Sequence, residues 1–163
     1  MSRNLAAEAH ACMQVLTAMG IPLGQIREIV PDSRSRRRWG VCRQNPDGSY
    51  RIGISVRLLS DEVPLRSLQE TLYHELLHTA PDCMKHTGNW KRYAEQVNRE
   101  LGLCIRRTES AEEAGVPEDP RIRYKYVCIR CGGEVVRYRA CSFTRHPEHY
   151  RCRRCGGSFR KVF

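Results

Sequence analysis

Residues 65–80 of the chain read LRSLQETLYHELLHTA. Leucines recur in this stretch at spacings of three and four, which is typical of the buried face of an amphipathic helix. His74 and His78 are four residues apart, so a helix places both imidazoles on one side with Glu75 beside them. We therefore predict a helix from about 62 to 79 that buries its leucines and presents an HExxH metal-binding pattern.

A catalytic zinc ion needs a third protein ligand and an open position for water. Cys83 and His86 both follow the helix in a loop that Pro81 opens, and both are candidates. We favour His86, because three neutral imidazoles leave the ion more electrophilic than a set that contains a thiolate. Glu75 is the predicted general base, and the predicted reaction is hydrolysis of an amide bond.

The remaining patterns in the first two thirds of the chain predict an α+β domain. Residues 2–19 have the apolar spacing of a helix that stops at Gly20. Residues 39–42 and 50–58 flank the turn sequence Asn-Pro-Asp-Gly and predict a β-hairpin. A further helix begins near Trp90 and ends at Gly102. We place this domain at residues 1–106 and a polar, acidic linker at residues 107–123.

Two CxxC pairs near the C-terminus predict a structural zinc ribbon at residues 124–163. The pairs are Cys128 with Cys131 and Cys152 with Cys155, and Gly-Gly follows each of them. Four thiolates complete a tetrahedral site and leave no open position, so this zinc stabilises the fold. A segment of about 40 residues buries too little surface to fold alone, so we expect a bound metal ion to stabilise it.

Three runs of sequence, residues 33–59, 73–80 and 86–93, resemble the SprT-like zinc metallopeptidase domain, which in many members is followed by a zinc ribbon. The resemblance implies a small zincin-like fold and a strand beside the active-site helix that binds an extended peptide. It also implies that Glu75 is the catalytic base and that the zinc ligands are His74, His78 and His86. The chain departs from the family where His86-Thr87-Gly88 replaces the usual His-Gly. Tyr93 and the arginines near Trp39 are candidates for stabilising the oxyanion.

The net charge of +10 is carried entirely by the end of the chain, where residues 121–163 hold 12 Lys/Arg and two Asp/Glu. So concentrated an excess favours a polyanion partner, and we expect DNA or RNA to bind this segment. Its aromatic residues either stack on bases or fill the small core of the ribbon. The arginine tract at residues 34–38 either extends this basic surface or positions Trp39. The predicted nucleic-acid contacts are Arg137, Arg139, Arg145, Arg151, Arg153 and Arg154.

These patterns together predict a zinc metalloprotease that binds two zinc ions per chain and acts on protein or peptide substrates. The mean hydropathy is −0.57 and no long apolar run is present, so we expect no membrane association. The N-terminus lacks the pattern of a signal peptide, which predicts a cytoplasmic protein and disfavours disulfides. The alternative is a catalytically idle, zinc-stabilised nucleic-acid-binding protein.

Overall fold

The structure, a computed structural model, describes residues 3–35, 38–108 and 110–163 and divides into two units, residues 1–117 and 118–163. Arg36 and Arg37 of the arginine tract lie outside the described residues. Helices and two small sheets make up the chain, so the predicted α+β class is confirmed. Among the described residues, no helix combines the length and apolar character that crossing a membrane requires.

The first unit is built on a three-stranded sheet with the strand order β1-β3-β2. Strands β2 (Gly40–Gln44) and β3 (Tyr50–Ser55) form the predicted antiparallel hairpin. Strand β1 (Ile26–Asp32) pairs in parallel with the other side of β3. Because β1 and β2 are the terminal strands, each has one edge that no strand of the described chain pairs.

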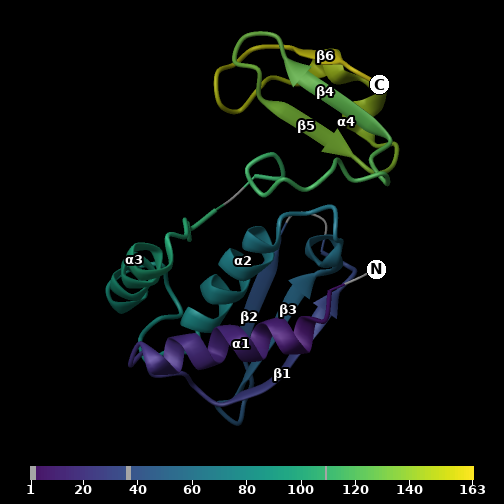
Figure 1. The fold of residues 1–163 in the computed structure, drawn as a ribbon. Helices are drawn as coiled ribbons and strands as arrows, with labels where there is room; N and C mark the ends of the chain where they lie inside the picture. Colours follow the sequence, from purple (N-terminus) through teal and green to yellow (C-terminus); the bar gives the residue numbers. More distant parts are fainter. Residues whose placement is uncertain (1–2, 36–37, 109) are drawn as a thin grey trace. The chain divides into compact units, whose positions relative to one another are not determined.

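Among the helices that the structure describes in this unit, α1 and α2 lie over one face of the sheet (Figure 1). Ile52 and Ile54 of β3 face these helices and are fully buried. The predicted leucine stripe of α2 meets them, so this helix is fixed by burial along its whole length. The helices are α1 (Leu5–Ala18), α2 (Leu65–Leu77) and α3 (Asn89–Leu101). The fully buried leucines of α2 are Leu68, Leu72, Leu76 and Leu77.

Two features of this unit differ from the sequence-based prediction. Strand β1 was not predicted, because its apolar run is short and contains Pro31, which disfavours a central strand. The structure places β1 at the sheet edge, where a missing N–H is tolerated. The predicted strand 50–58 ends at Ser55, and a 3₁₀ turn, η1 (Val56–Leu59), follows it. The Ser55 hydroxyl caps this turn by accepting the Arg57 N–H.

The segment predicted as a linker contributes to the first unit. Ala114 and Val116 are buried in its core, and Gly115 packs against Pro64. The Val116 N–H donates to the Ala111 carbonyl, so the segment also forms a turn of its own. Residues 107–123 were predicted to be a linker because the segment is mostly polar and acidic. Two isolated apolar residues in such a segment give no clear signal that they are buried. The first unit extends to Pro117.

The second unit is a small sheet with the order β5-β4-β6 and antiparallel pairing throughout (Figure 1). Tyr126 and Phe143 are buried and meet edge to face, with 4.8 Å between their ring centroids. Tyr150 and Phe159 each pack on Phe143 at 5.3 Å. Tyr126 and Phe143 therefore form the core of the unit, and the more exposed rings of Tyr150 and Phe159 pack against it. Its elements are β4 (Tyr124–Cys128), β5 (Glu134–Arg137), α4 (Ser142–Arg145), η2 (Pro147–His149) and β6 (Phe159–Lys161).

Candidate functional site

Three imidazoles converge beside the C-terminal end of α2. The Nε2 atoms of His74 and His78 lie 3.3 Å apart, and that of His86 lies 2.8 Å from the first and 3.1 Å from the second. Ligand nitrogens around a tetrahedral zinc ion are about 3.3–3.4 Å apart, since each Zn–N distance is about 2.0–2.1 Å. The spacing of the three nitrogens therefore fits one small metal ion.

Hydrogen bonds to backbone carbonyls fix the tautomers of the two helical histidines. The Nδ1–H of His74 donates to the Arg106 carbonyl at 2.8 Å, and the Nδ1–H of His78 donates to the Cys83 carbonyl at 2.7 Å. A neutral ring that carries its proton on Nδ1 has a lone pair on Nε2. At least two of the three converging nitrogens are therefore acceptors, and they repel one another unless a cation lies between them.

The histidines are held in the neutral form that metal binding requires. Burial, followed by the charges of His78 and His86, lowers the pKa of His74 to about 4. Burial also lowers the pKa of His78 and of His86. Proton competition at neutral pH is therefore weak at this site.

A strap at residues 102–106 positions His74 through the Arg106 carbonyl. The buried Glu70 carboxylate accepts the Cys104 N–H at 2.6 Å and the Arg66 Nε–H at 2.9 Å. Asn98 of α3 accepts the Ile105 N–H at 2.7 Å and donates to the Ile105 carbonyl at 3.1 Å. The strap is thus anchored to α2 and α3, and it delivers the Arg106 carbonyl to the His74 ring.

Trp90 and Cys83 support the imidazole cluster without joining it. The Trp90 ring packs on all three histidine rings, with centroid distances from 4.6 to 5.6 Å. Cys83, the alternative third ligand, is fully buried and contributes its backbone carbonyl to His78, while the candidate metal group contains His86. Sequence reasoning placed Trp90 on the following helix, but the contact with the rings needed the tertiary structure.

Glu75 lies against strand β2 and is buried, with 6% of its surface exposed. Burial raises the pKa of Glu75 to about 8, although the Arg38 charge and the Cys42 backbone N–H lower it. A Cβ atom on Gly40 would lie 2.5 Å from the Glu75 Cγ, so a larger residue there would displace the Glu75 side chain. The glycine after Trp39 therefore allows β2 to approach the carboxylate closely.

The three histidines and Glu75 open onto one cleft of about 360 Å³. Its opposite wall includes Gly40, Val41 and Cys42 of β2, whose outer edge no described strand pairs. Arg38 lines the cleft and Tyr93 does not, among the described residues. The cleft therefore combines a candidate metal group, a buried carboxylate and an open strand edge.

The four cysteines of the two CxxC pairs also converge. The sulfurs of Cys128 and Cys155 lie 3.4 Å apart, and those of Cys131 and Cys152 lie 3.7 Å apart. These distances exclude disulfides and approach the about 3.8 Å expected when each Zn–S distance is about 2.3 Å. The group offers four sulfur ligands, so it matches a closed structural zinc site.

The two cysteine turns have the same backbone design. In each, the first cysteine N–H donates to the carbonyl of the second glycine, and the first glycine N–H donates back to that cysteine carbonyl. Gly132 and Gly156 have φ values of 69° and 73°, which favour glycine. Backbone N–H groups of Cys131 and Arg130 lower the pKa of Cys128 to about 6. The first cysteine of the first turn is therefore favoured as a thiolate before any metal binds, whereas the pKa of Cys155 in the second turn is raised.

The predicted nucleic-acid contacts fall into two groups. Arg137 lies over the Phe143 ring at 5.1 Å, and Arg151 donates to the carbonyls of Glu148 and Tyr150, so both have structural contacts. The other four are exposed, and no ion pair joins them to an acidic side chain of the described chain. They are Arg139, Arg145, Arg153 and Arg154.

We expect the full chain to bind two zinc ions, one at each convergent group. His74→Ala and Cys128→Ser should each remove one ion, because each variant removes a ligand from a different group. Elemental analysis of the purified protein by mass spectrometry measures the stoichiometry. His10→Ala, an exposed histidine on α1, should retain both ions. An unchanged zinc content in either ligand variant would contradict the assignment.

Glu70→Ala should weaken metal binding at the histidine group about 10- to 100-fold, because the strap that orients His74 loses its acceptor. Competition with a chromogenic chelator measures this affinity, and the ribbon site of the same protein is an internal reference. Glu70→Gln keeps an acceptor for the Cys104 N–H and should retain most of the affinity. Glu95→Gln, an exposed change on α3, should have no effect. Unchanged affinity in Glu70→Ala would show that the strap does not position the ligand.

Comparison with known proteins agrees with this geometry. A family model described as the SprT-like family matches residues 22–109, which is more than half of the chain and contains all three histidines and Glu75. No curated protein and no solved structure matches the chain significantly. The match covers the sheet, the helix α2 and the strap, and it stops before the ribbon. The chain therefore belongs to the SprT-like family.

Proposed function

We propose that the chain is a zinc-dependent metallopeptidase that hydrolyses peptide bonds in protein substrates. The observation that carries this proposal is the shared cleft, onto which His74, His78, His86 and Glu75 all open. Three protein ligands leave room for further coordination, which is typical of catalytic rather than structural zinc sites. Membership of the SprT-like family supports the same reaction class.

Strand β2 is the proposed binding site for the substrate backbone. Its outer edge is unpaired in the described chain, and Gly40, Val41 and Cys42 line the cleft. An extended peptide can add to such an edge through main-chain hydrogen bonds, which require no particular side chains. The substrate is therefore an unfolded or extended segment of protein, held beside Glu75.

Glu75 is the proposed proton carrier. A zinc ion held by the three histidines supplies Lewis acidity, which lowers the pKa of water and polarises a carbonyl. Glu75 follows His74 directly in the chain, accepts the proton of the attacking water and donates it to the leaving amine. In the metal-free chain, burial raises its pKa to about 8, so the carboxyl group can both hold and release a proton near neutral pH.

A catalytically idle, metal-stabilised binding protein is the alternative. Such a protein has no use for a carboxylate at this position, and burying one is unfavourable. Glu75 nevertheless remains buried, and the glycine at position 40 leaves room for its side chain. This close fit around the carboxylate favours the enzyme.

Glu75→Gln should lower the rate of cleavage of an unfolded protein substrate by about 10²- to 10⁴-fold, because it removes the general base. The glutamine has nearly the same shape, so the zinc content should remain two ions per chain. Gel electrophoresis of a denatured substrate over time measures the rate, and Glu95→Gln on α3 is the matched control. Equal cleavage by wild type and Glu75→Gln would sink the proposed mechanism and favour the alternative.

We also propose that the second unit binds single-stranded DNA or RNA. Tyr126 and Phe143 form its core, and the exposed arginines are the proposed contacts with phosphate. Binding of this kind is electrostatic and weakens as salt is added.

Arg153→Gln/Arg154→Gln should weaken binding of a labelled single-stranded oligonucleotide and reduce the salt dependence. Two lost phosphate contacts change the slope of log K against log salt by about 1.4. Fluorescence anisotropy at several salt concentrations measures both quantities. Lys91→Gln/Arg99→Gln removes the same charge from exposed positions on α3 and should leave the slope unchanged. Identical slopes in the two double variants would contradict a role for these arginines.

A further inference from the structure

The sheet of the first unit has a second face, which α1 and α2 do not cover (Figure 1). Successive residues of a strand point to opposite faces. Because Ile52 and Ile54 of β3 face the helices, Arg51 and Gly53 face the other way. Their partners in β2, Arg43 and Val41, lie on the same outer face.

This outer face is hollowed to a volume of about 680 Å³. Gly53 forms part of its floor, beside Val41 and Val30. A Cβ atom on Gly53 would lie 3.2 Å from the Val41 Cγ1, so a side chain here would fill the floor. Arginines surround the hollow. They are Arg34, Arg38, Arg43 and Arg51.

The positive charge around the hollow is only partly compensated. Arg43 lies directly opposite Arg51 in the β2–β3 ladder, an arrangement that is unfavourable for like charges. Glu28 pairs with Arg51 at 2.6 Å. Within the described part of the chain, no ion pair joins Arg34, Arg38 or Arg43 to an acidic side chain.

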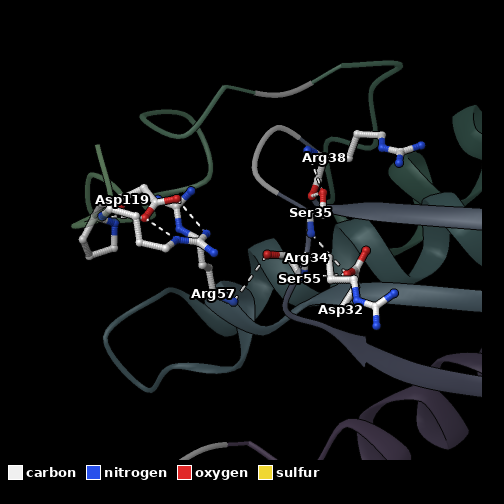
Figure 2. A network of polar contacts seen from close by, with 9 residues as sticks. Asp32, Arg34, Ser35, Arg38, Ser55, Arg57 and Asp119 are labelled. Atoms are coloured by element: carbon white, nitrogen blue, oxygen red, sulfur yellow. Dashed lines mark hydrogen bonds and ion pairs between the residues drawn. The ribbon is translucent and has the colours of Figure 1, made fainter. Parts of the chain in front are cut away.

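Asp32, an acidic residue in the lining, is engaged in holding the backbone. Its Oδ1 accepts the Arg34 N–H at 2.8 Å and the Ser35 N–H at 3.2 Å (Figure 2). The Ser35 hydroxyl in turn donates to the Arg38 carbonyl at 2.7 Å (Figure 2). These bonds fix the two ends of the arginine tract at the rim of the hollow, and they leave the guanidinium groups available.

We propose that this hollow binds the phosphodiester backbone of a single-stranded nucleic acid. Guanidinium groups match phosphate oxygens with paired N–H donors, and several of them around one concavity suit a ligand with repeated charges. The small apolar floor of Val30, Val41 and Gly53 suits a sugar or an unstacked base between phosphates.

An acidic peptide fits this surface less well. The N–H and C=O groups of β3 are paired with β1 and β2, so the sheet face offers a peptide no main-chain partners. A peptide lying there would leave its own amides to water, whereas at a strand edge it would pair them. A phosphodiester chain has no amides to satisfy and needs only the guanidinium donors.

The hollow and the metal cleft are adjacent. Arg38 lines both the hollow and the cleft that contains Glu75. A single-stranded nucleic acid bound in the hollow would therefore lie at the border of the metal cleft, on the first unit itself. The inference depends neither on peptidase activity nor on binding by the second unit, so each of the three can fail separately.

The test compares two double variants of the full chain by anisotropy with a labelled oligothymidylate over a range of salt concentrations. Arg34→Gln/Arg43→Gln should lower the affinity at least about tenfold and reduce the salt slope by about 1.4. Both side chains are exposed and form no ion pair with the described residues, so the thermal unfolding temperature should not change. Lys91→Gln/Arg99→Gln is the charge-matched control and should bind as wild type does. Equal losses in the two variants would overturn the proposal.

Arginine modification by phenylglyoxal, read by peptide mass spectrometry, locates the binding and identifies the ligand class. The oligonucleotide should slow modification of Arg43 severalfold while Arg99 on α3 is unaffected. Tripolyphosphate and polyglutamate at matched charge concentration should protect Arg43 much less. Equal protection by tripolyphosphate would indicate a site for small phosphates, and equal protection by polyglutamate would indicate an acidic protein partner. Either result, or no protection by the oligonucleotide, would overturn the proposal.

Discussion

The first unit depends on the convergence of three imidazole nitrogens, at least two of which direct lone pairs at a common centre. Two of the rings carry their proton on Nδ1, because backbone carbonyls of Arg106 and Cys83 accept it. The resulting repulsion is relieved when a cation occupies the centre, so the ligands are arranged for an ion before it binds. Much of the surrounding structure, including the strap and Trp90, holds rings in an arrangement that they would not adopt alone.

The helix α2 joins this site to the core. One face buries Leu68, Leu72 and Leu76, another presents the two histidines, and Glu75 lies between these faces against β2. A shift of the helix along its axis would misplace both faces together, because leucines and ligands share one rigid backbone. The close approach of β2 at Gly40 adds a second constraint, since any larger residue would displace the carboxylate.

The sequence predicted the parts of the structure that have a regular period or a fixed spacing. The leucine stripe of α2, the hairpin and the two CxxC turns belong to this class. Strand β1 was not predicted, because Pro31 disfavours a central strand. The structure tolerates Pro31 because β1 lies at the edge of the sheet. The strap was also missed, because the roles of Glu70 and Asn98 arise from contacts between segments that are far apart in the chain. A single sequence carries no periodic signal for such contacts.

The two candidate metal groups differ in what determines their geometry. In the ribbon, both turns are set by local backbone hydrogen bonds and by glycines with positive φ, so each cysteine pair is positioned by its own few residues. At the histidine group, the ligands come from a helix and a loop, and their orientation depends on carbonyls from two further segments. In the first group, the geometry within each cysteine pair therefore depends little on changes elsewhere in the chain. The second is sensitive to them, and residues such as Glu70 can tune its metal affinity without touching the metal.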